Sequence, residues 1–171
     1  MERATPIYCY TTMNSPVNVL VLVASDTALV GVFWQSLNYA PDTFKDAVVN
    51  DTHPILVTTK RQLQAYFEKK LQTFDIPIEL IGSDFQKQVW KALLTVPYGK
   101  TKSYGDLARQ LGDIKTVRAV GGALNRNPIA IIVPCHRIIG ANGQLVGFGG
   151  GLPNKTILLD IEIPNQQASL F

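Results

Sequence analysis

The hydrophobic pattern of the first third of the chain predicts β-strands. Ile7–Met13, Val17–Ala24 and Ala28–Trp34 are rich in β-branched and apolar residues, and a polar turn separates the last two. Apolar arms on either side of such a turn favour an antiparallel hairpin. Ile55–Leu71 has apolar residues at helical spacing, and Ile76–Ile81 is predicted to be a short strand. The pattern therefore predicts a small α/β unit.

Two features interrupt and end this unit. Asn38–Pro54 is polar and broken by prolines, which predicts a loop that contains at most a short helix. At Gly82 both the hydrophobic pattern and the charge balance change. We therefore expect an α/β support domain at residues 1–81 and a second, mostly helical domain at residues 82–171.

Helix signals dominate the second half. Ser83 and Gln86 have the spacing of a capping box at the start of a helix. Ser103 is expected to cap a second helix, Tyr104–Leu111, which Gly112 ends. Two short helices joined by a tight, glycine-containing turn would form a helix-turn-helix, with the third helix opening at Asp113 and ending before Asn127-Pro128. The predicted apolar stripe of that helix is Ile114, Val117, Val120 and Leu124.

The remaining pattern predicts three further features. Ala130–Val133 is a buried run. Asn142-Gly143 lies between apolar arms in Ile138–Val146, which predicts a hairpin that could act as a wing. Lys155–Ile163 has the pattern of a final helix.

Composition restricts the class of protein. The 171 residues are 46% hydrophobic and 17% charged, which is typical of a globular chain. The apolar runs are far shorter than the ~20 residues that span a bilayer, so we expect no membrane association. Cys9 and Cys135 are too few for a disulfide framework, which favours a reducing, cytoplasmic setting.

The net charge of +3 is unevenly distributed along the chain. Residues 1–82 carry six basic and eight acidic side chains, a net charge of −2, whereas residues 83–171 carry ten and five, a net charge of +5. The second half is therefore the candidate for binding a polyanion. Ordinary solubilising charge explains the imbalance equally well at this stage.

The segment Pro134-Cys135-His136-Arg137 is the strongest candidate for chemistry. A cysteine becomes a nucleophile as the thiolate, and a nearby imidazole and guanidinium both favour that form. A buried cysteine beside a surface histidine is the more frequent situation for an arbitrary pair, because free cysteine is among the most buried residue types. The residues around Cys135 and His136 are therefore needed to distinguish a reactive pair from an ordinary buried cysteine.

Those surroundings resemble the O6-alkylguanine-DNA alkyltransferases, also called methylated-DNA–protein-cysteine methyltransferases. The resemblance covers Phe85 to Glu162. It is carried by Arg118-Ala119-Val120-Gly121-Gly122-Ala123-Leu124, Asn127-Pro128, Ile132-Val133-Pro134-Cys135-His136-Arg137-Ile138-Ile139, Gly150-Gly151-Leu152 and a helix with Lys155, Leu158 and Leu159. For the fold, it implies a ribonuclease H-like α/β domain with an antiparallel sheet, followed by a winged helix-turn-helix domain.

The resemblance also implies roles for individual residues. Cys135 matches the alkyl acceptor, His136 the histidine that activates it through a water, and Glu162 the carboxylate that orients this histidine. Asn127 matches a hinge asparagine, and Tyr104 a tyrosine that helps to extrude the nucleotide and donates to the base. Arg118 matches the arginine finger that fills the base stack, on a helix near Thr116–Asn125 that lies in the minor groove. Further expected DNA contacts are Thr116, Ala119, Gly121 and Gly122, and the expected pocket residues are Pro134, Val146, Phe148, Gly149 and Gly150.

This chain departs from the family pattern at three places. Phe148 stands where many members have tyrosine, Gly149 where some have serine, and Asn125-Arg126 differs from some relatives. Some members bind zinc in the first domain, but Cys9 and His53 are too few here for a tetrahedral site. We therefore expect no metal and no cofactor.

Taken singly, each of these residues has an ordinary structural explanation. Tyr104 could be a half-buried aromatic and Asn127 a turn former, and Arg118 and Glu162 could be surface charges. In order around Cys135, they favour single-turnover repair of O6-alkylguanine in double-stranded DNA by a monomer. Two alternatives remain at this stage. One is a lesion sensor that flips the base without accepting the alkyl group, and the other is a cysteine amidase or peptidase.

Overall fold

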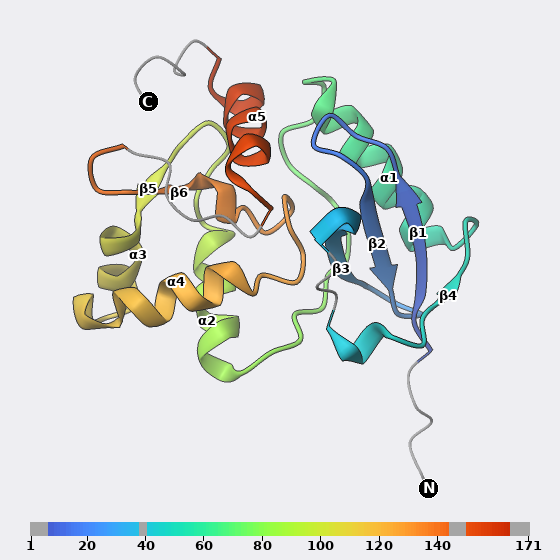
Figure 1. Cartoon of the computed structure of the whole chain (residues 1–171), viewed down its shortest axis with the longest axis horizontal. Coiled ribbons are helices and arrows are strands. Elements are labelled where there is room, and N and C mark those ends of the chain that lie inside the picture. Colours follow the sequence, from blue (N-terminus) through green and yellow to red (C-terminus); the bar gives the residue numbers. More distant parts are fainter. Residues whose placement is uncertain (1–6, 38–40, 144–149, 165–171) are drawn as a thin grey trace, which may run out of the picture. The chain divides into compact units, whose positions relative to one another are not determined.

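The structure, a computed structural model, describes residues 7–37, 41–143 and 150–164. The chain divides into two compact units, Met1–Glu79 and Leu80–Phe171, each of which is described here by itself (Figure 1). None of the helices in the described ranges is long and apolar enough to cross a membrane.

A four-stranded sheet forms the centre of the first unit. The strands β1 (Cys9–Met13), β2 (Leu20–Ala24) and β3 (Leu29–Trp34) pair antiparallel, and the β2–β3 pair is the hairpin that the hydrophobic pattern predicted. A short edge strand, β4 (Val48–Val49), pairs parallel to β1 and completes the order β3-β2-β1-β4. The sheet is therefore mixed: the predicted antiparallel sheet is present in β1, β2 and β3, and the parallel edge strand β4 was not predicted.

Helix α1 (Pro54–Phe67) packs on this sheet (Figure 1). The His53 ring caps it, with Nδ1 accepting a hydrogen bond of 3.2 Å from the backbone N–H of Ile55. The helix ends before the predicted Leu71, because the chain turns at Lys69, whose φ is +62°. Two 3₁₀ turns, Gln35–Leu37 and Asp42–Phe44, lie in the connection from β3 to β4.

The predicted strand Ile76–Ile81 is reduced to an isolated bridge between Leu29 and Ile78. Leu29 donates to the Pro77 carbonyl, and Glu79 donates to the Leu29 carbonyl. Pro77 has no N–H, so the ladder cannot continue on the N-terminal side of this bridge.

The second unit is mostly helical. Its elements are α2 (Asp84–Leu93), β5 (Lys102–Ser103), α3 (Tyr104–Gln110), α4 (Val117–Asn125), β6 (Ile138–Ile139) and α5 (Leu152–Glu162). The Trp90 indole of α2 donates to the Ala123 carbonyl of α4 at 2.9 Å, which fixes α4 against the core. β6 pairs in parallel with β5, a partner that the sequence did not predict. The second arm of the predicted wing, Gln144–Val146, lies outside the described residues.

Local capping explains why these helices begin where the sequence predicted. Ser83 with Gln86, and Ser103 with Asp106, form reciprocal capping boxes. The third helix differs from its prediction, since a 3₁₀ turn at Ile114–Thr116 precedes α4. Ile114, in this turn, and Val117, the first residue of α4, are both exposed, so the buried stripe of α4 contains only Val120, Ala123 and Leu124.

Candidate active site

Cys135 begins a short 3₁₀ helix, Cys135–Arg137, at the end of a buried run. The run turns tightly twice before it: the Ile132 N–H donates to the Ala130 carbonyl, and the Cys135 N–H to the Val133 carbonyl. Ile131, at the centre of the first turn, has a φ of +72°, which is strained for a β-branched residue. Such strain persists only where the surrounding contacts hold it.

Asn127 supplies those contacts. Its Nδ2 donates to the Val133 carbonyl at 2.8 Å, and its Oδ1 accepts from the Ile129 N–H at 3.0 Å. The buried amide therefore ties the end of α4 to the residues just before Cys135. The sequence placed Asn127 at such a junction, and the structure gives it both hydrogen bonds.

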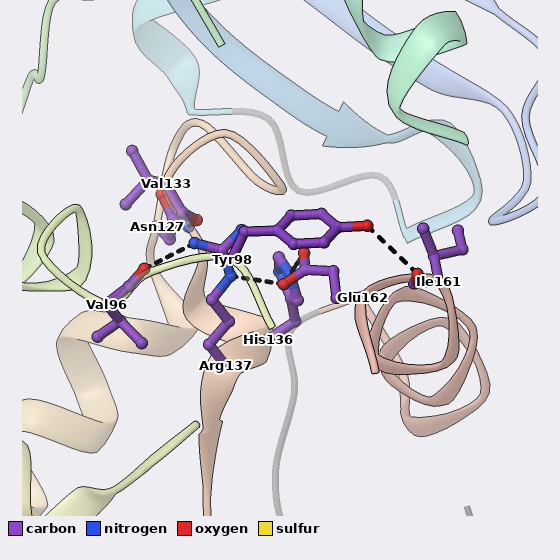
Figure 2. Close-up of polar contacts among 8 residues, drawn as sticks. All are labelled: Val96, Tyr98, Asn127, Val133, His136, Arg137, Ile161 and Glu162. Atoms are coloured by element: carbon purple, nitrogen blue, oxygen red, sulfur yellow. Dashed lines mark hydrogen bonds and ion pairs between the residues drawn. The ribbon is translucent and has the colours of Figure 1, made fainter. Parts of the chain in front are cut away.

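His136, Arg137 and Glu162 form a buried polar cluster with the Val96–Tyr98 segment (Figure 2). His136 Nε2 lies 2.6 Å from Glu162 Oε2, and Arg137 Nε donates to Glu162 Oε1 at 2.6 Å. Arg137 Nη1 donates to the Val96 carbonyl at 2.7 Å. A carboxylate oxygen only accepts hydrogen bonds, so His136 Nε2 must carry the proton.

The opposite ring nitrogen of His136 is the acceptor. Among the buried side-chain nitrogen and oxygen atoms of the described residues, His136 Nδ1 is the one without a hydrogen-bond partner. Burial lowers the pKa of His136, Glu162 raises it, and Arg137 and Lys155 lower it, with a net lowering. The imidazole is therefore neutral near pH 7, with a lone pair on Nδ1.

Glu162 is the fixed anion of the cluster. Burial raises its pKa, but the charges and hydrogen bonds of His136 and Arg137 outweigh burial and lower the pKa to about 2. The His136 charge acts only while the ring is protonated, whereas the hydrogen bonds from His136 and Arg137 and the permanent Arg137 charge also lower the Glu162 pKa when the ring is neutral.

The surroundings of the sulfur differ from the prediction. Burial raises the pKa of Cys135, which is 8% exposed, while the Asn127 hydrogen bond and the Lys155 charge lower it by less. The sequence predicted that His136 and Arg137 would favour the thiolate, but burial dominates and the resting sulfur is a thiol. A base must therefore take its proton before it can attack.

Lys155 and Tyr104 are two further side chains near Cys135. Lys155 is fully buried on α5, donates to the Ile138 carbonyl at 2.6 Å, and has its pKa lowered by burial to about 8, against an opposing effect of Cys135. Burial raises the pKa of Tyr104, the first residue of α3, and a thiolate at Cys135 raises it further. The Tyr104 hydroxyl is thus protonated at neutral pH and able to donate.

The other residues expected to contact DNA lie on α4 and at the residue just before it, Thr116. Arg118, Ala119 and Gly122 are exposed, while Thr116 and Gly121 are partly exposed. A Cβ added to Gly121 or Gly122 would meet nothing within 4 Å, so neither glycine is required by packing within the chain.

Two of the five predicted pocket residues, Pro134 and Gly150, fall within the described residues. Val146, Phe148 and Gly149 fall outside the described residues. Pro134 is buried beside Cys135, and the buried Gly150 accepts a hydrogen bond from Asn154 Nδ2 at its carbonyl. Within the described ranges, no group of three His, Cys, Asp or Glu side chains is placed to hold a metal ion.

Sequence reasoning missed Lys155 as a member of the site and missed the pairing of Arg137 with Glu162. Lys155 shares one face of α5 with Leu158, Leu159 and Glu162, and a lysine in an otherwise buried stripe was a usable signal. The partner of Arg137 lies 25 positions further along the chain, a separation with no periodic signature.

Two domain models of one protein family match this chain. Residues 84–163 match the DNA-binding domain of 6-O-methylguanine DNA methyltransferase, and residues 8–80 match the ribonuclease-like domain of the same family. The chain belongs to this family. The α/β-then-helical architecture predicted from the sequence is thereby confirmed, with the sheet corrected to mixed.

Relatives in the family are similar over nearly their whole length. The methylated-DNA–protein-cysteine methyltransferase of Mycobacterium leprae is 46% identical over 91% of this chain and 92% of that protein. A crystal structure of the Mycobacterium tuberculosis O6-methylguanine methyltransferase is 44% identical, with a TM-score of 0.84 over 91% of this chain and 93% of that one. A structure of the Mycobacterium tuberculosis protein in complex with DNA has a TM-score of 0.82 at 41% identity, over 94% of this chain and 98% of that one.

Proposed function

We propose that this methylated-DNA–protein-cysteine methyltransferase repairs O6-alkylguanine in duplex DNA by moving the alkyl group to Cys135 Sγ. The observation that carries the assignment is the buried Cys135 thiol next to a neutral His136 whose Nε2 is held by Glu162 at 2.6 Å. The other cysteine, Cys9, lies in the first unit, where Asn50 is its hydrogen-bond partner at 4.0 Å.

The proposed reaction is a displacement at the alkyl carbon. The thiol proton passes through a bridging water to His136 Nδ1, and the sulfur attacks the carbon. The S–C bond forms while the C–O6 bond breaks, and its electron pair remains on the guanine. Tyr104, as a hydroxyl donor, reduces the charge that develops on the leaving purine. The thioether product has no route back to the thiol, so each molecule reacts once.

The buried sulfur requires the damaged base to leave the duplex. Extrusion of a nucleotide costs a few kcal/mol, which Arg118 offsets by entering the stack in place of the base. The exposed face of α4 and the basic second half support non-specific contact with the phosphate backbone, so DNA affinity should fall steeply with salt.

Intact mass after incubation with duplex DNA containing O6-methylguanine tests the acceptor. We expect the protein to gain one methyl group, located on Cys135 by peptide mapping, and Cys135→Ser to gain none. Cys9→Ser is the matched control and should react like the wild type. An unmodified mass together with tight binding would instead identify a lesion sensor, and turnover of activated acyl substrates would identify a hydrolase.

Gly122→Ala tests the DNA-binding face. Replacing a helical glycine by alanine stabilises a helix by roughly 0.5–1 kcal/mol, and the added methyl group has open space in this chain. We expect a more stable protein with weaker DNA binding, because the methyl group keeps the backbone away from the duplex. Unchanged affinity in fluorescence anisotropy would remove Gly122 from the interface. Arg118→Ala should lose both DNA affinity and the ability to extrude the base. Lys91→Gln, which removes a basic charge from the separate helix α2, is its control.

A further inference from the structure

Arg137 is a buried charge to which the proposed chemistry gives no role. Its guanidinium is held on several sides: Nε donates to Glu162 Oε1, Nη1 donates to the Val96 carbonyl, and the guanidinium carbon lies 5.7 Å from the centre of the Tyr98 ring. The Tyr98 hydroxyl in turn donates to the Ile161 carbonyl at 3.3 Å, next to Glu162 on α5 (Figure 2). Arg137 therefore joins the turn after α2, the Cys135 segment and the last turn of α5.

This arrangement divides the Glu162 carboxylate between two partners. Oε2 faces His136 and Oε1 faces Arg137, both at 2.6 Å. A carboxylate paired with the histidine alone would attract a second proton onto the ring and convert it to imidazolium, whose Nδ1 can no longer accept. A permanent cation on the other oxygen balances that attraction and also repels a positive ring.

We propose that Arg137 is a positioning residue for the transfer reaction, acting through Glu162 to keep His136 neutral with its proton on Nε2 and its Nδ1 lone pair available. This inference builds on the proposed role of His136 as the base for Cys135. The charges acting on His136 from the elements packed around it are Glu162 and Lys155 of α5 and Arg137 of its own turn. Tyr98, Tyr104 and Cys135 are the other titratable groups of the site.

The electrostatics of the cluster agree with this geometry. Arg137 contributes to lowering both the pKa of His136 and that of Glu162. A guanidinium fits better than an ammonium because its fork reaches the carboxylate and the Val96 carbonyl together.

Arg137→Gln tests the proposal through the pH profile of methyl transfer from saturating O6-methylguanine duplex. In the wild type the rate should fall on the acid side as His136 gains a proton. In Arg137→Gln this acid limb should move upward by roughly 1–3 pH units, because Glu162 then acts on the ring unopposed. Arg137→Lys, which keeps the charge, should restore a limb near that of the wild type.

A purely structural role for Arg137 predicts a different result. Val89→Ala, a buried apolar truncation in α2, controls for loss of stability, since it should lower the folded fraction while leaving the limb in place. An Arg137→Gln limb that coincides with those of the wild type and Val89→Ala would overturn the proposal. If Arg137→Gln does not fold, Arg137→Lys decides alone, and a shift of its limb by a full pH unit or more would overturn it.

Nitrogen-15 NMR of the imidazoles separates this inference from the proposed function. His53 and His136 are the two histidines of the chain, so both rings can be assigned. We expect a neutral His136 ring protonated on Nε2 in the wild type, and a doubly protonated ring that persists to higher pH in Arg137→Gln. This result stands even if Cys135 is not the acceptor, whereas a His136 ring already doubly protonated at pH 7 in the wild type would refute the inference.

Discussion

The two units of the chain bury different kinds of side chain. Among the described residues, the first unit buries a core of aliphatic and aromatic side chains from its strands and α1, with only three polar side chains, Thr11, His53 and Thr59. The second unit buries six polar or charged residues, and four of them are ionisable by type. They are Asn127, His136, Arg137, Asn154, Lys155 and Glu162.

The difference shows which unit is built for chemistry. Apolar packing in the first unit depends on shape and is insensitive to pH. A buried ion cluster brings little net stability, but each member depends strongly on the others. Substitutions should therefore act on the first unit through packing alone, and on the second through both stability and proton affinity.

Glu162→Gln should produce the largest effect. It leaves the buried Arg137 without its counter-ion, which we expect to destabilise the second unit by roughly 3–5 kcal/mol. The chain has one tryptophan in each unit, Trp34 and Trp90, both buried. Fluorine NMR of the 5-fluorotryptophan-labelled protein in urea therefore follows the two units separately, and the Trp90 midpoint should fall more than the Trp34 midpoint.

Asp160→Asn is the matched control for this change. It removes the same charge from the same helix at a partly exposed position, and should alter stability by less than about 0.5 kcal/mol. Equal losses of unfolding free energy in the Glu162 and Asp160 variants would mean that the buried polar cluster is no more sensitive to loss of a charge than the surface. That result would contradict the contrast between the two units.

The second-largest effect should come from acid, which should destabilise the second unit more than the first. The pKa of Glu162 is about 2 in the fold against an ordinary value of 4.5, so its stabilisation is complete above pH 4.5 and is lost as the pH falls toward 2. This difference corresponds to about 3 kcal/mol at most. Burial of neutral His136 adds a loss of the same sign below its ordinary pKa of 6.5.

Urea midpoints at pH 5 and pH 3 measure this effect. The Trp90 midpoint should fall more than the Trp34 midpoint, and Glu162→Gln should remove most of the excess. Leu22→Ala, in the buried face of β2, should cost roughly 2–5 kcal/mol at either pH because it removes only packing. A Leu22→Ala loss that grew with acid, or a Trp90 midpoint insensitive to it, would contradict the comparison.

Local signals made the helices predictable from the sequence. The capping boxes at Ser83 and Ser103 and the left-handed Gly112, with a φ of +107°, act within a few residues. They therefore fix the starts of α2 and α3 and the turn that follows α3 wherever those segments lie in the fold.

Non-local pairing was not predictable in the same way. Strand β4 is two exposed valines that exist as a strand only because β1 pairs with them, and β6 depends on β5 in the same manner. The site shows the same division. A motif around Cys135 located the reactive segment, but the salt bridge between Arg137 and Glu162 joins two elements that become neighbours only after folding.

Removing a cap should have the smallest effect of the three. Ser83→Ala deletes the hydroxyl that accepts from the Gln86 N–H at 3.1 Å, and we expect a loss of about 1 kcal/mol. The loss should appear at Trp90, in the same helix, with no change in the pH profile of methyl transfer. Ser83→Asp should restore most of it, since aspartate also caps and its charge suits a helix N-terminus. Only Glu162→Gln leaves a buried charge, that of Arg137, without water or a partner. A loss of unfolding free energy in Ser83→Ala as large as that in Glu162→Gln would therefore show that exposed polar contacts stabilise this unit as much as buried ones.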